Sequence, residues 1–168
     1  MELIKKLKSR QGFSLSEMLL AMLIIGLTVS FIGGGITVLK DAYDRITLRA
    51  EAQTLLSTVI TSVSAELRNA DEIEKIESDY GISQWSFYNP KRGYRMYLQN
   101  QNNNIYVKTE IASKEVPLLT KKLMTNGLVP KLEDLTYENQ VLTYTAKIYY
   151  KNEIYEEQTI SVRPVNAD

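Results

Sequence analysis

The 168-residue chain contains no cysteine and no histidine. Without cysteine, an exported domain cannot be held together by disulfide bonds. Without histidine, the chain lacks the commonest general base and a usual zinc ligand. Catalysis would have to use serine, threonine, lysine or aspartate, and no spaced motif singles out any of these as a nucleophile. We therefore expect a protein that is not an enzyme and that needs no cofactor and no metal.

Proline and net charge are also scarce. The first of four prolines is Pro90, so no proline interrupts a helix before that position. The chain has 20 basic and 20 acidic residues, and residues 69–168 alone have 12 basic and 14 acidic ones. A domain that holds DNA through its phosphates should show a basic surplus or a dense basic stripe. We therefore expect no nucleic-acid binding.

The N-terminal part combines a short basic leader with a long apolar run. Residues 18–39 form a run of 22 residues without a charge, and as a helix they would be about 33 Å long, close to the thickness of a bilayer's hydrocarbon core. The leader before the run has four basic residues (Lys5, Lys6, Lys8 and Arg10) and one acidic residue, Glu2. The positive-inside rule therefore predicts a single-pass anchor with a cytoplasmic N-terminus and the remaining chain outside.

A single acid stands directly before the apolar run. A charge inside a membrane costs roughly 2.5–3.5 kcal/mol on insertion scales, so Glu17 is a candidate functional residue. Ser14 and Glu17 also fit the Ser-x-x-Glu capping box, in which each side chain bonds the other residue's backbone N–H at a helix start. Capping explains an acid in the first turn. It does not explain the Gly12-Phe13 pair before the box, the basic leader or the charge-free run.

Residues 8–40, with Gly12-Phe13 ahead of Glu17 and the apolar run, resemble the class III leader of type IV pilins and of the pseudopilins of type II secretion and DNA-uptake machines. The resemblance implies that a membrane-embedded prepilin peptidase cuts after Gly12 and methylates the new N-terminus at Phe13. It also implies that Glu17 is used in assembly, where it pairs with the free amine of Phe13 on a neighbouring subunit. One departure is Ser16, because the family usually has a larger apolar residue or threonine there.

The resemblance further implies partners and a location. The partners are the prepilin peptidase, other pilin or pseudopilin subunits, an assembly platform protein, an ATPase that acts indirectly, and the membrane. The precursor would cross the membrane once before it enters a cell-surface or envelope filament. Secretion, DNA uptake (competence), adhesion and motility all use this leader, so the machine stays open. The absence of the disulfide-closed form of many major pilins favours a minor subunit.

Two alternatives concern the role of the apolar run. In a Sec signal peptide, residues 18–32 would be the apolar region and cleavage would fall near Gly34 or Gly35. The helical periodicity that continues beyond these glycines argues against such a cut. The other alternative is a membrane-anchored extracellular binding module that uses the helix only as a tether.

The helical pattern continues to about residue 69. Apolar residues recur near helical spacing beyond the membrane-length run (Leu39, Tyr43, Ile46, Ala50, Leu56, Ile60, Val63 and Leu67) and should pack against a sheet. Gly33, Gly34 and Gly35 lie inside the apolar part, where each glycine costs a helix roughly 0.5–1 kcal/mol relative to alanine. They are a candidate hinge that softens when subunits pack, or simply the small residues that let membrane helices pack closely.

From residue 70 the sequence becomes rich in tyrosine and β-branched residues. We expect strands at 85–88, 94–98 and 105–109, with a polar tip over 99–104, and a final hairpin of 141–150 and 153–162 around Lys151-Asn152. The form of 116–130 cannot be assigned. The fold class is therefore α+β, a long N-terminal helix packed on a small antiparallel sheet, with a leader (1–12), the helix (13–69) and an outer domain (70–168).

Two features of the outer domain have competing interpretations. The acidic run at 71–79 lacks the spacing of a calcium loop, and we expect a solvated helix end or loop there. The 11 tyrosines fit sheet packing with hydroxyls that reach water, with an aromatic ligand platform as the alternative.

Overall fold

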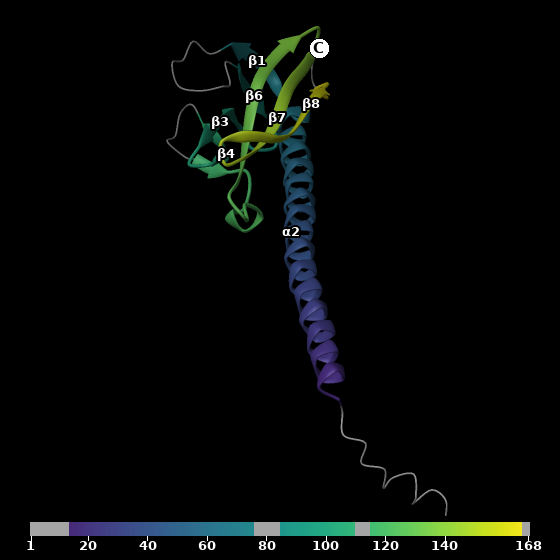
Figure 1. Cartoon of the computed structure of the whole chain (residues 1–168). Coiled ribbons are helices and arrows are strands. Elements are labelled where there is room, and N and C mark those ends of the chain that lie inside the picture. The colour runs from purple at the N-terminus through teal and green to yellow at the C-terminus, as the bar shows by residue number, and fades with distance from the viewer. Residues whose placement is uncertain (1–13, 76–84, 110–114, 166–168) are drawn as a thin grey trace, which may run out of the picture. The chain divides into compact units, whose positions relative to one another are not determined.

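The computed structural model describes residues 14–75, 85–109 and 115–165. Within them, one long α-helix precedes eight strands and a short 3-10 helix, in the order that Figure 1 shows. The elements are α2 (Leu15–Arg68), β1 (Asp71–Lys75), β2 (Trp85–Asn89), β3 (Tyr94–Gln101), β4 (Asn104–Thr109), β5 (Glu115–Pro117), η1 (Lys121–Leu123), β6 (Leu128–Glu138), β7 (Val141–Tyr150) and β8 (Glu153–Val162). The chain divides into two compact units, Met1–Ile46 and Thr47–Asp168, and α2 runs through the boundary.

The strands of the second unit form two antiparallel sheets. One sheet has five strands in the order β1-β2-β3-β4-β5, and the other has three in the order β6-β7-β8. The predicted α+β class, with a long helix packed on antiparallel strands, is confirmed. The sequence predicted one small sheet, whereas the structure has two. Strands β1, β5 and β6 were not among those that the sequence predicted, so the sequence offered no basis for dividing the strands between two sheets.

Three of the hairpins close through two-residue turns in which both residues have positive φ. These turns are Asn102-Asn103, Asn139-Gln140 and Lys151-Asn152, with φ between 49° and 68°. Two positive φ angles define a type I′ turn, whose twist matches that of paired strands, and asparagine tolerates this conformation well. The turn at Lys151-Asn152 is where the sequence predicted it. The polar tip is shorter than predicted, because the strand pairing continues to Gln101 opposite Asn104.

The segment at 116–130, which the sequence left unassigned, contains β5, η1 and the start of β6. Gly127 has a φ of +76° and directly precedes β6. Pro130 then lies inside β6, paired with Ile148 of β7. Proline cannot donate to a strand ladder, so it is tolerated here because β6 is an edge strand of its sheet.

The acidic segment is a strand and not the expected solvated helix end or loop. Asp71–Lys75 forms β1 at the edge of the five-stranded sheet. Arg95 of β3 donates from both terminal guanidinium nitrogens to the carbonyl oxygen of Glu72, at 3.0 and 2.9 Å, and pairs with Glu74 at 3.1 Å. These bonds hold an acidic strand that has little apolar surface to bury. Glu77 and Asp79 of the predicted run lie outside the described residues.

The C-terminal half of α2 supplies one wall of the core. Its buried residues are Ala52, Leu55, Leu56, Val59, Val63 and Leu67. They pack with apolar side chains of both sheets, among them Phe87, Met96, Leu132 and Ile148. The predicted packing stripe is wrong in its first half, because Tyr43 and Ile46 are 68% and 70% exposed. Both residues belong to the first unit, whereas the residues that bury the helix lie from Thr47 onward.

A few hydrogen bonds join α2 to the three-stranded sheet and join the two sheets to each other. The hydroxyl of Tyr144 on β7 donates to the carbonyl oxygen of Ile60 (3.1 Å) and lies 2.9 Å from the hydroxyl of Ser64. Burial raises the pKa of the Tyr144 hydroxyl, so it remains a neutral donor at physiological pH. Asn100 of β3 joins the two sheets, because its amide both donates to and accepts from the backbone of Leu132 on β6, each at 2.9 Å.

A charged cluster lies on the three-stranded sheet. Glu133 of β6 pairs with Lys147 of β7 at 2.7 Å and accepts a hydrogen bond from the hydroxyl of Tyr149 at 3.0 Å. The hydrogen bond from Lys147 lowers the pKa of Glu133, and the bond from Tyr149 acts in the same direction against the opposing effect of partial burial. Glu133 therefore favours the ionised state more in the folded protein than in the unfolded chain.

We predict that two truncated chains will behave differently. A chain that begins at Lys40 retains every buried residue of α2 and should be soluble and folded. A chain that begins at Asn69 loses that wall of the core, and should aggregate or unfold. Burying each Leu or Val side chain contributes about 1.5–3 kcal/mol, so the loss of several of them is comparable to the roughly 5–15 kcal/mol that holds a domain together. Circular dichroism and gel filtration of both chains test this, and cooperative unfolding of the Asn69 chain would contradict it.

We also predict an acid-dependent loss of stability through Glu133. A carboxyl with a lowered folded-state pKa stabilises the protein above its unfolded pKa of about 4.3, and this contribution disappears as the pH falls through the folded value. The detergent-solubilised chain should therefore lose its stability advantage over Glu133→Gln as the pH drops from about 7 to about 3. Urea unfolding at each pH gives the comparison. A difference that stays constant across the range would show that the charge of Glu133 contributes nothing.

Candidate functional site

The start of α2 forms the predicted capping box. Ser14 immediately precedes the helix, and its hydroxyl oxygen accepts from the backbone N–H of Glu17 at 3.3 Å. In return, the backbone N–H of Ser14 donates to Oε2 of Glu17 at 2.8 Å. Each residue therefore satisfies a backbone donor of the other, as a capping box requires. The acid lies in the first turn, next to the positive end of the helix dipole.

Two further contacts at this site go beyond capping. The hydroxyl of Ser14 also donates to Oε2 of Glu17, at 2.9 Å, and lies 3.0 Å from the hydroxyl of Ser16. Oε2 thus accepts two bonds from one residue. From the sequence, Ser16 stood out only because the resembled family usually has another residue there. In the structure its hydroxyl lies within hydrogen-bond distance of the Ser14 hydroxyl.

The helix surface that follows Glu17 is apolar and exposed. An 18-residue window of α2 near the N-terminus has a mean hydropathy of 2.3, and none of it is buried, so α2 is long and apolar enough to cross a membrane. The hydroxyls of Thr28 and Thr37 donate to the carbonyl oxygens of Ile24 and Gly34, both at 2.8 Å. Such bonds satisfy hydroxyl groups where no water is present. This part of α2 fits a membrane anchor.

The glycine triplet lies within continuous helix. Gly33, Gly34 and Gly35 are all helical, and a Cβ atom built on any of them would meet nothing within 4 Å. No contact within the described part of the chain therefore requires glycine at these positions. A hinge that softens on assembly stays a prediction, as does close packing against a second helix.

The predicted processing residues lie outside the part that the structure describes. Gly12 and Phe13 precede Ser14, the first described residue. The first described residues begin one position after Phe13, with the capping box.

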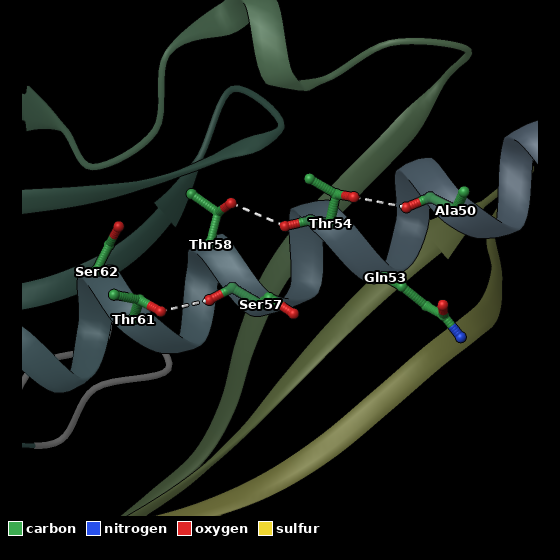
Figure 2. Close-up of a pocket in the computed structure, with 7 residues that line it drawn as sticks. All are labelled: Ala50, Gln53, Thr54, Ser57, Thr58, Thr61 and Ser62. Carbon is green, nitrogen blue, oxygen red and sulfur yellow. Dashed lines mark hydrogen bonds between the residues drawn. The ribbon is translucent and has the colours of Figure 1, made fainter.

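A face of α2 that the sequence did not single out carries small polar side chains. It lines a shallow hollow of about 620 Å3 formed by Ala50, Gln53, Thr54, Ser57, Thr58, Thr61 and Ser62. Figure 2 shows that Thr54, Thr58 and Thr61 turn their hydroxyls back to carbonyl oxygens of the same helix. These three hydroxyl groups have their hydrogen-bond partners within α2. The face is therefore a shallow surface of mostly small side chains. The sequence does contain a signal for this face, because Thr54, Thr58 and Thr61 follow one another at spacings of four and three.

The tyrosines of the described strands serve mainly in packing. Tyr144 is fully buried, and Tyr150 packs edge-on against Tyr155 with ring centroids 6.0 Å apart. Tyr137 packs edge-on against Trp85 in the same way, at 5.9 Å. Edge-to-face pairs of this kind stabilise a fold beyond the area they bury. Among the described residues, no group of three or more acidic side chains is placed to hold a metal ion.

Fold and helix start together define an α+β chain with a membrane-length N-terminal helix and a capped acid at its entrance. Residues 7–33 match the family model described as the prokaryotic N-terminal methylation motif. This match supports the type IV pilin and pseudopilin family for the chain. It covers the leader and the first part of α2 and does not extend to the strands. Comparison with curated proteins and with solved structures found no match.

Proposed function

We propose that this chain is a minor pilin or pseudopilin subunit. It is inserted as a precursor, cleaved after Gly12, methylated at Phe13 and then assembled through α2 into a type IV pilus-like or secretion/DNA-uptake filament. The observation that carries the proposal is the methylation motif at residues 7–33, which ends inside the charge-free and exposed stretch 18–39 of α2. In this proposal the chain is a structural subunit, and the chemistry belongs to the peptidase that processes it.

The capped acid supports the assembly step. Glu17 is the last charged residue before Lys40, and a carboxylate at the entrance of an apolar segment is costly unless it finds a partner. The free amine of Phe13 on a neighbouring subunit supplies that partner. The basic leader supports a cytoplasmic N-terminus before cleavage. The platform protein and the ATPase enter the proposal only through the resemblance to the family.

The alternative is a membrane-anchored binding module that uses α2 only as a tether. The core argues against a pure tether, because residues 52–67 of α2 are an integral part of the folded unit. The machine that the filament serves stays open, as do a hinge at Gly33, Gly34 and Gly35 and the choice of a minor over a major subunit.

The first prediction from this proposal concerns processing. Mass spectrometry of the protein from its native host should show loss of residues 1–12 and one additional methyl group on Phe13. Gly12→Leu should leave the precursor uncut, since the peptidase needs a residue without a side chain at the cut. Ser9→Leu is a matched control in the same leader and should be processed. A mature N-terminus near Gly35 would instead indicate a Sec signal and exclude the proposal.

The second prediction separates assembly from capping at Glu17. Glu17→Gln retains the capping box, because glutamine completes it as well, but it removes the charge. This variant should be cleaved and inserted normally and should enter filaments at least about tenfold less, the equivalent of losing one charge-assisted bond. Immunoblots of sheared filaments against total membranes measure the ratio. Equal assembly of Glu17→Gln and wild type would mean that Glu17 only caps the helix.

A further inference from the structure

We infer that Asn126 is a site of spontaneous deamidation, and that the reaction releases the loop before β6 from α2. The side chains of Thr125 and Asn126 in this loop both donate to Oε2 of Glu51. The reaction is the hydrolysis of a primary amide through a cyclic imide, with water as its co-reactant. The inference goes beyond the proposed function and does not depend on it, because it concerns only a loop and a helix of the second unit.

The loop is a tight turn with a glycine directly after the asparagine. The backbone N–H of Leu128 donates to the carbonyl oxygen of Thr125 at 3.0 Å, which closes the turn. Asn126 and Gly127 have φ of +52° and +76°, as in a type I′ turn. Both residues are exposed, and a Cβ atom built on Gly127 would meet nothing within 4 Å. Water therefore reaches Asn126, and no side chain on the next residue crowds it.

The covalent step needs only Asn126, Gly127 and water. The backbone nitrogen of Gly127 forms a bond to Cγ of Asn126, and the bond between Cγ and Nδ2 breaks. The proton from the Gly127 nitrogen leaves with Nδ2 as ammonia, and a succinimide remains. Water then adds to one carbonyl carbon of the succinimide and opens the ring. The product at position 126 is aspartate or isoaspartate, and no atom is oxidised or reduced.

The residue that follows the asparagine distinguishes this turn from two others. A side chain on that residue hinders closure of the ring, and glycine has none. Asn102 and Asn139 each begin a turn in which both residues have positive φ, but the residues that follow them are Asn103 and Gln140. The backbone conformation is therefore similar in the three turns, and only the turn at Asn126 combines it with a glycine in the second position.

Deamidation turns an attraction to α2 into a repulsion. Nδ2 of Asn126 lies 2.6 Å from Oε2 of Glu51, and the hydroxyl of Thr125 lies 2.9 Å from the same oxygen. In the product an oxygen takes the place of Nδ2, so a donor becomes an acceptor and a second negative charge faces Glu51. Two carboxylates at this distance disfavour each other. The loop therefore leaves α2, while Ala52 and Leu128, which follow the contact residues in sequence, stay buried in the core.

The first experiment measures the reaction. The detergent-solubilised full chain is incubated in mildly alkaline buffer, and peptide mapping by mass spectrometry follows deamidation at each asparagine. Asn126 should react at least about tenfold faster than Asn102 and Asn139, which corresponds to a difference of about 1.4 kcal/mol between the barriers. Equal rates at the three turns would show that Asn126 is not a preferred site, and would overturn the inference.

The second experiment measures the release of the loop independently of the reaction rate. Asn126→Asp supplies the charge of the product, and aspartate before glycine still forms a type I′ turn. Hydrogen exchange of residues 124–127 should rise about three- to tenfold in this variant, the effect of losing one exposed bond to a charged group. Asn139→Asp is the matched control, because it adds the same charge in another turn. It should leave the exchange of residues 124–127 unchanged.

A double variant tests whether Glu51 is the cause. Glu51→Gln combined with Asn126→Asp exchanges donor and acceptor, so the amide of the glutamine can donate to the new carboxylate. Hydrogen exchange of the loop should then return to within about twofold of wild type. If Asn126→Asp exchanges like wild type, or if the double variant exchanges as fast as Asn126→Asp alone, the contact with Glu51 does not hold the loop and the inference is wrong.

Discussion

The structure depends on the ability of one α-helix to satisfy its own backbone in two different environments. Apart from its ends, an α-helix pairs its backbone groups internally, so its side chains largely decide what surrounds it. In α2, 54 residues use this property. The first part contains a charge-free, mainly apolar stretch at 18–39, and the part from Ala52 onward fills one side of a protein core. Threonine hydroxyls in both parts donate to carbonyl oxygens of the same helix, so they need no hydrogen-bond partner outside it.

Prediction from the sequence succeeded where one physical signal dominated. The helix expected over residues 13–69 is described as Leu15–Arg68, with residue 13 outside the described part, and no proline or turn signal interrupts its periodicity. The final hairpin was predictable from the alternation of apolar and polar residues, and Leu142, Tyr144, Ala146 and Ile148 are buried in the structure. Strands β1 and β5 were missed because they are short edge strands, held mainly by pairing and charges, with few apolar residues. The first half of the packing stripe was wrong, since periodicity tells which face is apolar and not what covers it.

The candidate site likewise has a part that the sequence predicts and a part that it does not. The capping box was predictable, because its residues are adjacent in sequence and its geometry is local. The bond between Ser16 and Ser14 was not, since a serine hydroxyl has several local acceptors and the sequence does not choose among them. Gly12 and Phe13 precede the described residues, so their proposed role in processing depends on the sequence pattern alone. The part of the site that the structure can test begins at Ser14.

The second unit has no cysteine, and polar side chains connect its elements at three places. Tyr144 joins the three-stranded sheet to α2, Asn100 joins the two sheets, and Glu66 of α2 accepts from Asn89 and Arg92 at the β2–β3 turn. A disulfide stabilises mainly by restricting the unfolded chain. These contacts do not restrict the unfolded chain, because they exist only when the partners are already in place. The unit therefore folds without an oxidising step, and its stability rests on the apolar wall that α2 supplies.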